Sequence, residues 1–104
     1  MNLTIHRGTK EIGGSCVEIS TNKTRIIIDF GMPLINRDKT EFNFNNYKSD
    51  SVEELIKKKV LPYIRGLYES STDTQPDALL ISHPHVDHYG FTHFINKSIP
   101  VYLG

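Results

Sequence analysis

The sequence predicts one α/β layered domain, and three observations support this fold class. The chain has 104 residues, which is the size of a single domain. Residues 25–30 form an almost wholly apolar, β-branched run, which is typical of a strand covered on both faces. Residues 78–103 run from an apolar strand through a polar loop and a short helix to a second apolar strand. That order is typical of a parallel crossover unit in a layered α/β domain.

The first part of the chain predicts an antiparallel arrangement of strands. Residues 3–6 form a short strand, residues 13–14 are a two-glycine turn, and residues 15–19 alternate as the side chains of a strand do. Residues 21–24 then turn the chain into the apolar run at 25–30.

The middle part, residues 31–77, is a long connection with one predicted helix. An Asn-rich stretch at 36–46 is expected to be a polar loop. Ser51 lies three residues before Glu54, which is the spacing of a capping box. Apolar residues then recur at a helical period, and Pro62 limits the helix.

The last part predicts a strand at 78–82, a helix at 91–95 and a strand at 99–103. The chain stops at Gly104, directly after a strand, where a parallel sheet would normally continue. We therefore expect residues 1–104 to be the N-terminal, truncated part of a larger domain.

Composition limits the classes of function. Twelve Lys and Arg balance twelve Asp and Glu, so a nucleic-acid partner would need a local basic patch. The one basic run, residues 57–59, is most simply the solvated end of the predicted helix. Cys16 is the single cysteine, which excludes an internal disulfide and a two-cysteine metal knuckle. A single cysteine is typical of a protein in a reducing compartment, and the sequence contains neither a membrane span nor a signal peptide. We therefore expect a cytoplasmic protein.

The segment His83-Pro84-His85-Val86-Asp87-His88 carries the chemistry of this sequence. It places three imidazoles and a carboxylate at the C-terminal end of a predicted buried strand, where α/β sheets present ligand sites. These groups are ligands that Zn²⁺, Mn²⁺ or Fe accept. In an extended loop, His83 and His85 point the same way and could hold one ion, with Asp87 and His88 reaching a second.

The same residues resemble a family signature. HxHxDH after an apolar strand that ends in Ser is similar to the signature of the metallo-β-lactamase-fold hydrolases. The segments RGTKEIGGSC at 7–16 and IIIDFG at 26–31 resemble the opening of the ribonuclease J and cleavage-factor branch, whose nucleases carry a β-CASP insert. The resemblance implies that the chain is the N-terminal half of an αββα sandwich.

The resemblance also implies roles for individual residues. His83 and His85 would hold the first metal ion, and Asp87 and His88 the second, with Asp87 also orienting the attacking hydroxide. Asp29 matches the family's first motif, an aspartate that supports the metal loop without binding the ion. Two Zn ions are expected in the complete domain, with Mn or Fe as alternatives. Members of the family complete this site with further His and Asp residues downstream, which this sequence lacks. The two histidines outside the HxHxDH segment, His6 and His93, lie in no motif.

The resulting hypothesis is a metal-dependent hydrolase, a phosphodiesterase or ribonuclease that uses a hydroxide bound by two metals to act on RNA or DNA. The site is incomplete in this chain, which we therefore expect to be inactive alone. A thiolester or lactone hydrolase of the same fold is one alternative. The other is a non-catalytic half-domain that folds by self-association or with a partner, because apolar strands such as the one at 99–103 would otherwise lack cover.

Overall fold

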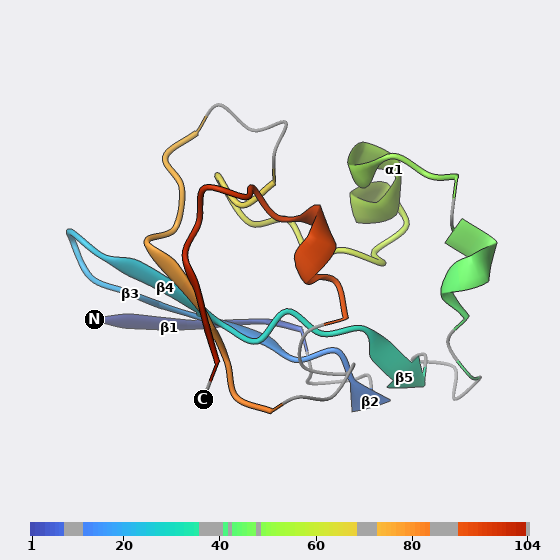
Figure 1. Ribbon diagram of the computed structural model, residues 1–104, viewed down its shortest axis with the longest axis horizontal. Coiled ribbons are helices and arrows are strands. Elements are labelled where there is room, and N and C mark those ends of the chain that lie inside the picture. The colour runs from blue at the N-terminus through green and yellow to red at the C-terminus, as the bar shows by residue number, and fades with distance from the viewer. Residues whose placement is uncertain are drawn as a thin grey trace.

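A computed structural model describes residues 1–7, 12–35, 41, 43–47, 49–68, 73–83 and 90–103 of the chain. Seven strands, one α-helix and two short 3-10 helices lie within these ranges (Figure 1). The strands are β1 (Asn2–Arg7), β2 (Ile12–Gly13), β3 (Cys16–Ser20), β4 (Arg25–Ile28), β5 (Pro33–Ile35), β6 (Ala78–Ile81) and β7 (Val101–Leu103). The helices are η1 (Phe44–Tyr47), α1 (Val52–Lys57) and η2 (Thr92–Phe94).

Five strands form one mixed sheet in the order β1-β3-β4-β6-β7. The strands β1, β3 and β4 are antiparallel neighbours, whereas β4, β6 and β7 run parallel to one another. Both the predicted antiparallel start and the predicted parallel crossover are confirmed. The parallel pairing of β4 with β6 brings together the ends of two strands that are far apart in the sequence.

A second, two-stranded sheet pairs β2 with β5 and was not predicted. The turn expected at 13–14 is wrong, because Gly13 belongs to β2; Gly14 follows the strand with φ 69°. A left-handed backbone of this kind favours glycine, because glycine has no Cβ to clash with the chain.

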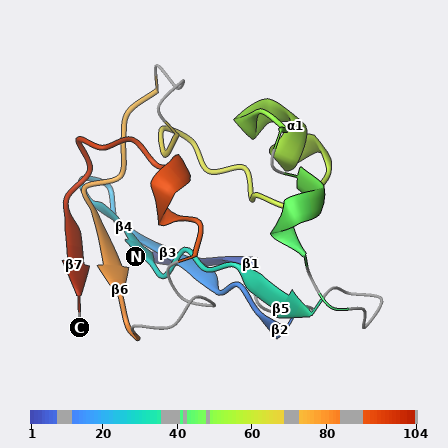
Figure 2. The same ribbon diagram turned by 45° about the vertical axis from the view of Figure 1, so that its right-hand side comes forward.

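The helices lie on one side of the five-stranded sheet, as the two views in Figures 1 and 2 agree. Side chains from β4 and β6 point into this layer, where Ile27 and Leu79 are fully buried. They join a core that Leu55 of α1 and Phe91 complete from above, and Phe44 and Tyr47 of η1 pack against it. The hydrophobic core therefore lies between the sheet and the helical layer.

The opposite face of the sheet corrects one prediction. The run at 25–30 was expected to be covered on both faces, but Ile26 and Ile28 are only half-buried. Leu80, which is the register partner of Ile28, is 37% exposed. Strand alternation puts these side chains on the face away from the helices, so this strand is covered on one face alone.

The helices differ from their predictions in length. The predicted capping box is present, since Ser51 Oγ accepts from Glu54 N–H at 3.2 Å and the Glu54 carboxylate accepts from Ser51 N–H at 3.3 Å. The basic run is solvent-exposed as predicted, and Lys58 pairs with Asp50 at 2.7 Å. The helix expected at 91–95 is a single 3-10 turn, η2. In the described ranges, no helix has the length and apolar character needed to cross a membrane.

Candidate metal centre

The candidate site begins where two parallel strands end side by side. Asp29 follows β4 and Ser82 follows β6. The Asp29 N–H donates to the Leu80 carbonyl at 2.8 Å and so extends the strand ladder by one residue. This pairing sets Asp29 beside the first residues of the loop that carries the His-rich motif.

Asp29 is held tightly in this position. Its side chain is buried, with 5% of the residue exposed, and its backbone has φ 63°. The left-handed region is costly for residues other than glycine, although Asp and Asn tolerate it better than most. Its carboxylate accepts two hydrogen bonds from Ser82, one from the backbone N–H and one from Oγ–H, both at 2.7 Å. Strained residues that the surrounding structure fixes in this way cluster at functional sites.

The contact continues from Ser82 to His83. Ser82 Oγ lies 3.0 Å from Nδ1 of the His83 imidazole, and His83 is exposed at the end of β6. A chain of three polar side chains therefore runs from a buried carboxylate to an exposed imidazole. Asp29 is thus linked through Ser82 to the first histidine of the motif, and its role in supporting the metal loop stays a prediction.

The other predicted ligands, His85, Asp87 and His88, lie outside the residues that the structure describes. Within the described part, no group of three His, Cys, Asp or Glu side chains is arranged to hold a metal ion. The four-residue ligand set therefore stays a prediction. The donor chemistry of the segment fits a divalent ion, because imidazole and carboxylate are both common ligands of zinc.

His6, the first histidine outside the HxHxDH segment, is engaged elsewhere. Its Nε2 donates to the Glu18 carboxylate at 3.0 Å, and Arg25 Nε donates to the other oxygen of that carboxylate at 2.9 Å. The hydrogen bond from Arg25, and with it that from His6, holds the pKa of Glu18 below its usual value. The side chains of His6 and Glu18 are both mostly buried. His6 therefore has a structural role within the sheet.

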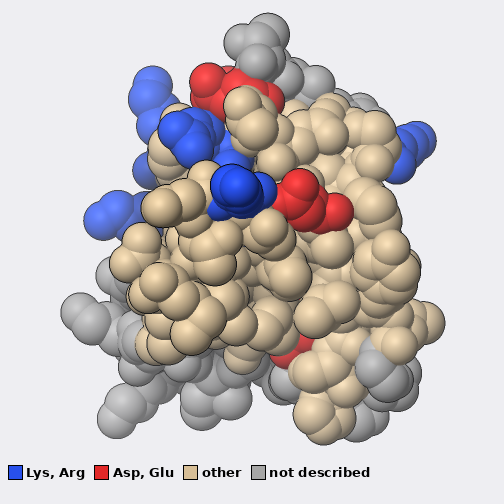
Figure 3. All heavy atoms as spheres, turned by 90° about the vertical axis from the view of Figure 1, so that its left-hand side faces the viewer, with Lys and Arg blue, Asp and Glu red and all other residues tan. Residues whose placement is uncertain are grey.

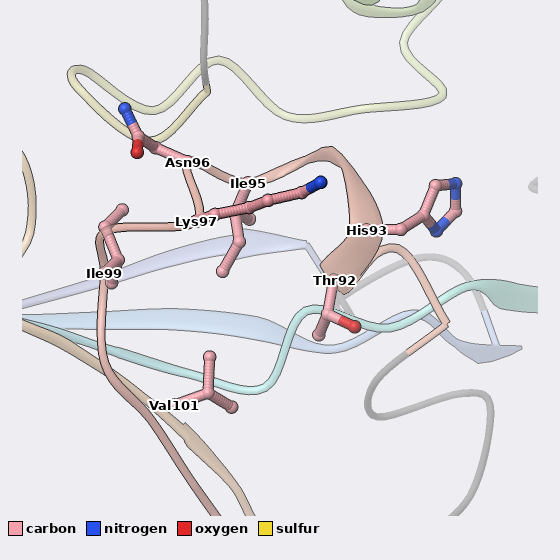
Figure 4. Close-up of a pocket in the computed structure, with 7 residues that line it drawn as sticks. All are labelled: Thr92, His93, Ile95, Asn96, Lys97, Ile99 and Val101. Atoms are coloured by element: carbon pink, nitrogen blue, oxygen red, sulfur yellow. The ribbon is translucent and has the colours of Figure 1, made fainter.

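His93, the second histidine outside the HxHxDH segment, belongs to an aromatic cluster. Its ring centroid lies 4.1 Å from that of Phe94 and 6.3 Å from that of Phe44. A cavity of about 420 Å³ opens beside η2, and His93 is one of its lining residues, together with Ile95, Lys97 and Val101 (Figure 4). His93 therefore has a packing role in the helical layer.

The charge on one face of the molecule bears on the recognition of a polyanion. Figure 3 shows one face of the molecule, on which the Lys and Arg side chains gather mainly in the upper part. Below them, the described surface is almost wholly uncharged. A basic track for a polyanion is not apparent on the described part of this face.

Ser82 is the functional candidate that sequence reasoning did not assign. The sequence showed that the apolar strand ends in Ser directly before His83. The contact with Asp29 joins residues 53 positions apart and depends on the pairing of β4 with β6, so no local sequence pattern indicates it.

Comparison with known proteins assigns the family. The model of the metallo-beta-lactamase superfamily matches residues 9–102, so the chain belongs to this superfamily. Members of this superfamily are metal-dependent hydrolases that generally bind divalent metals, typically zinc. The αββα class of fold predicted from the sequence is thereby confirmed.

Individual relatives place the chain near the ribonuclease J branch. It is 31% identical over 88 residues to an "RNase J-like protein" of Methanocaldococcus jannaschii, an alignment that covers 85% of this chain and 14% of that protein. It is 30% identical over 84 residues to "Transcription termination factor FttA" of the same organism, covering 81% of this chain and 10% of the factor. The predicted resemblance to the β-CASP branch is confirmed at this modest identity.

A solved structure agrees with the fold. A crystal structure of a protein of unknown function from Enterococcus faecalis V583 superposes with a TM-score of 0.72 at 25% identity, covering 96% of this chain and 24% of that one. Of the two curated relatives named above, this chain spans about a tenth of the length of the termination factor and about a seventh of the length of the RNase J-like protein.

Proposed function

We propose that this chain carries the first metal-binding motif of a phosphodiesterase, more narrowly a ribonuclease. The observation that carries the proposal is the hydrogen-bonded chain from Asp29 through Ser82 to His83, which fixes the first imidazole of an HxHxDH segment at the end of β6. Nuclease-like relatives support RNA as the substrate class.

Four side chains of the motif would hold the metal ions. His83 and His85 bind the first ion, and Asp87 and His88 bind the second, with zinc as the expected metal and Mn or Fe as alternatives. Divalent ions at such a site activate water and stabilise negative charge on a phosphoryl oxygen. Asp29 contributes by holding Ser82, and Asp87 contributes a carboxylate that orients the attacking water.

Metal binding is the direct test of this assignment. We expect calorimetric titration with Zn²⁺ to give binding that His83→Ala or His85→Ala weakens by roughly 10-fold or more, because each substitution removes a ligand. His93→Ala is the matched control, since it removes an imidazole outside the motif and should leave binding unchanged. Equal affinity of the wild type and His83→Ala would contradict the proposed site.

Turnover tests the substrate class and the completeness of the site. Four side chains are too few for two metal ions that each want about three protein ligands and solvent. We therefore expect the 104-residue chain to hydrolyse labelled single-stranded RNA slowly or not at all with added Zn²⁺ or Mn²⁺. Turnover abolished by His85→Ala would show that this chain supplies a working site unaided. Thiolester and lactone substrates, assayed in parallel, test the alternative hydrolase.

A second candidate role is that of a half-domain that associates with another copy. The face of the sheet away from the helices carries apolar side chains on every strand, which we call the open face: Leu3, Ile5, Val17, Ile19, Ile26, Ile28, Leu80 and Tyr102. Leu3 is 68% exposed, and in β7 Tyr102 is 57% exposed. Contiguous apolar area of this kind favours association in water.

A further inference from the structure

The polar chain at the end of β6 has a defined direction of hydrogen donation. An ionised carboxylate holds no proton and can only accept hydrogen bonds. At 2.7 Å from Asp29, the Ser82 hydroxyl must therefore be the donor of that bond. A hydroxyl has one hydrogen, so toward His83 the same oxygen can only accept.

The direction of donation fixes the tautomer of His83. Since Ser82 Oγ accepts at 3.0 Å from Nδ1, the proton of the neutral ring is on Nδ1. Nε2 then carries the lone pair, which is the form that an imidazole needs to bind a metal through Nε2.

We propose that Ser82 is a positioning residue that transmits the charge of Asp29 to His83 and so presets the imidazole for metal binding through Nε2. This inference rests on the proposed function, because it takes His83 to be a ligand. It adds a residue that the motif itself does not contain.

Three features make the hydrogen-bonded relay from Asp29 through Ser82 to His83 rigid. The Ser82 backbone N–H donates to the same carboxylate as its hydroxyl, so both the backbone and the side chain of the serine are bound to Asp29. Asp29 is itself buried, and its N–H is bound to the Leu80 carbonyl. The relay is thus built on the ends of two paired strands, which hold groups more precisely than loops do.

The tautomer of His83 in the metal-free chain is the first test. ¹⁵N NMR at a pH of about 8, where histidine is normally neutral, should show Nδ1 protonated in the wild type. Asp29→Asn should reverse the tautomer. Its amide oxygen would accept from Ser82 N–H and its NH₂ would donate to Ser82 Oγ, which would then donate to Nδ1 and leave the proton on Nε2. A wild type protonated on Nε2, or an unchanged tautomer in Asp29→Asn, would overturn the relay.

Metal affinity is the second test, and it uses variants that leave Asp29 intact. Ser82→Ala removes the hydroxyl, and we expect Zn²⁺ affinity to fall by roughly 10-fold, as for the loss of other outer-shell partners. Ser82→Thr keeps a hydroxyl on the same carbon and should retain both the tautomer and the affinity. Ser98→Ala is the control, because it removes an exposed hydroxyl that is also hydrogen-bonded but lies before β7.

The results separate the relay from the proposed function. If Ser82→Ala binds Zn²⁺ as the wild type does while His83→Ala does not, the ligand assignment stands and the relay is wrong. If the wild type binds no Zn²⁺ although Nδ1 is protonated as expected, the proposed function fails and the hydrogen-bonded chain remains.

Discussion

Gly66 is a residue at which backbone geometry requires glycine. It has φ 77°, and a Cβ added there would overlap the carbonyl oxygen of Thr74. An L-residue at this position meets both the cost of the left-handed region and a collision with backbone. The neighbouring segments at 64–68 and 73–76 therefore require glycine at this point.

Gly66→Ala should lower the free energy of unfolding by about 2–4 kcal/mol, measured by urea denaturation. Gly66→Asn separates the two causes, because Asn tolerates the left-handed region but also has a Cβ. Equal losses for the two variants would identify the collision with Thr74 as the main cause. A loss below about 0.5 kcal/mol for Gly66→Ala, the range of ordinary surface substitutions, would refute the close approach.

Glu18 links stability to pH through its contacts with Arg25 and His6. The Arg25 guanidinium, with His6, lowers the pKa of this carboxyl in the folded state below its usual value of 4.5. A lowered folded pKa means that the stabilisation is fully present above the unfolded pKa. It is lost as the pH falls through the folded pKa.

Glu18→Gln should therefore flatten the decline of stability below a pH of about 4.5. At neutral pH the same change should cost about 1–3 kcal/mol, since it weakens hydrogen bonds that involve a charged acceptor. Thermal unfolding across a pH series measures both effects. Glu41→Gln, which changes an exposed carboxyl, is the control. Parallel pH profiles for Glu18→Gln and the wild type would show that the cluster contributes nothing.

At the scale of elements, the sequence predicted what local patterns determine. Alternation at 15–19 and the apolar runs at 25–30 and 78–82 correspond to β3, β4 and β6, and the Ser51–Glu54 spacing marks the start of α1. The pairing of β2 with β5 depends on contacts between segments of two and three residues, which are too short to carry a periodic signal. For the same reason, the five residues at 91–95 could not specify an α-helix.

The candidate site divides in the same way. The ligand types and their spacing in HxHxDH are local, so the sequence was sufficient to propose them. The link from Asp29 to Ser82 depends on the non-local pairing of β4 with β6, which only the three-dimensional structure supplies.

The N-terminal cap of α1 is expected to be necessary because the helix is so short. Six residues cannot form a stable helix alone, so α1 depends on its capping box and on the burial of Leu55. Ser51→Ala should cost about 1 kcal/mol in unfolding free energy, whereas Ser51→Asn keeps a capping group and should cost little. Urea denaturation of the two variants measures this difference. Equal losses would show that the side-chain cap does not stabilise α1.

The whole molecule combines a well-covered face with the open face of the same sheet. The helical layer buries Ile27, Leu55 and Leu79 completely, while the other side leaves a row of apolar side chains partly in solvent. β7 is also an edge strand of the five-stranded sheet, and its three residues are all exposed. An exposed apolar edge is a common site of pairing with another chain.

Self-association through the open face is the prediction at this scale. We expect light scattering to show a dimer whose fraction rises with protein concentration, because two open faces can cover each other's apolar side chains. Ile5→Thr and Leu80→Thr, which reduce apolar area on the open face, should shift the equilibrium toward monomer. Tyr63→Ser is the control, since Tyr63 is 69% exposed but follows α1 in the helical layer. A monomer at every concentration, with a cooperative melt that does not depend on concentration, would mean that the described core is sufficient without a partner.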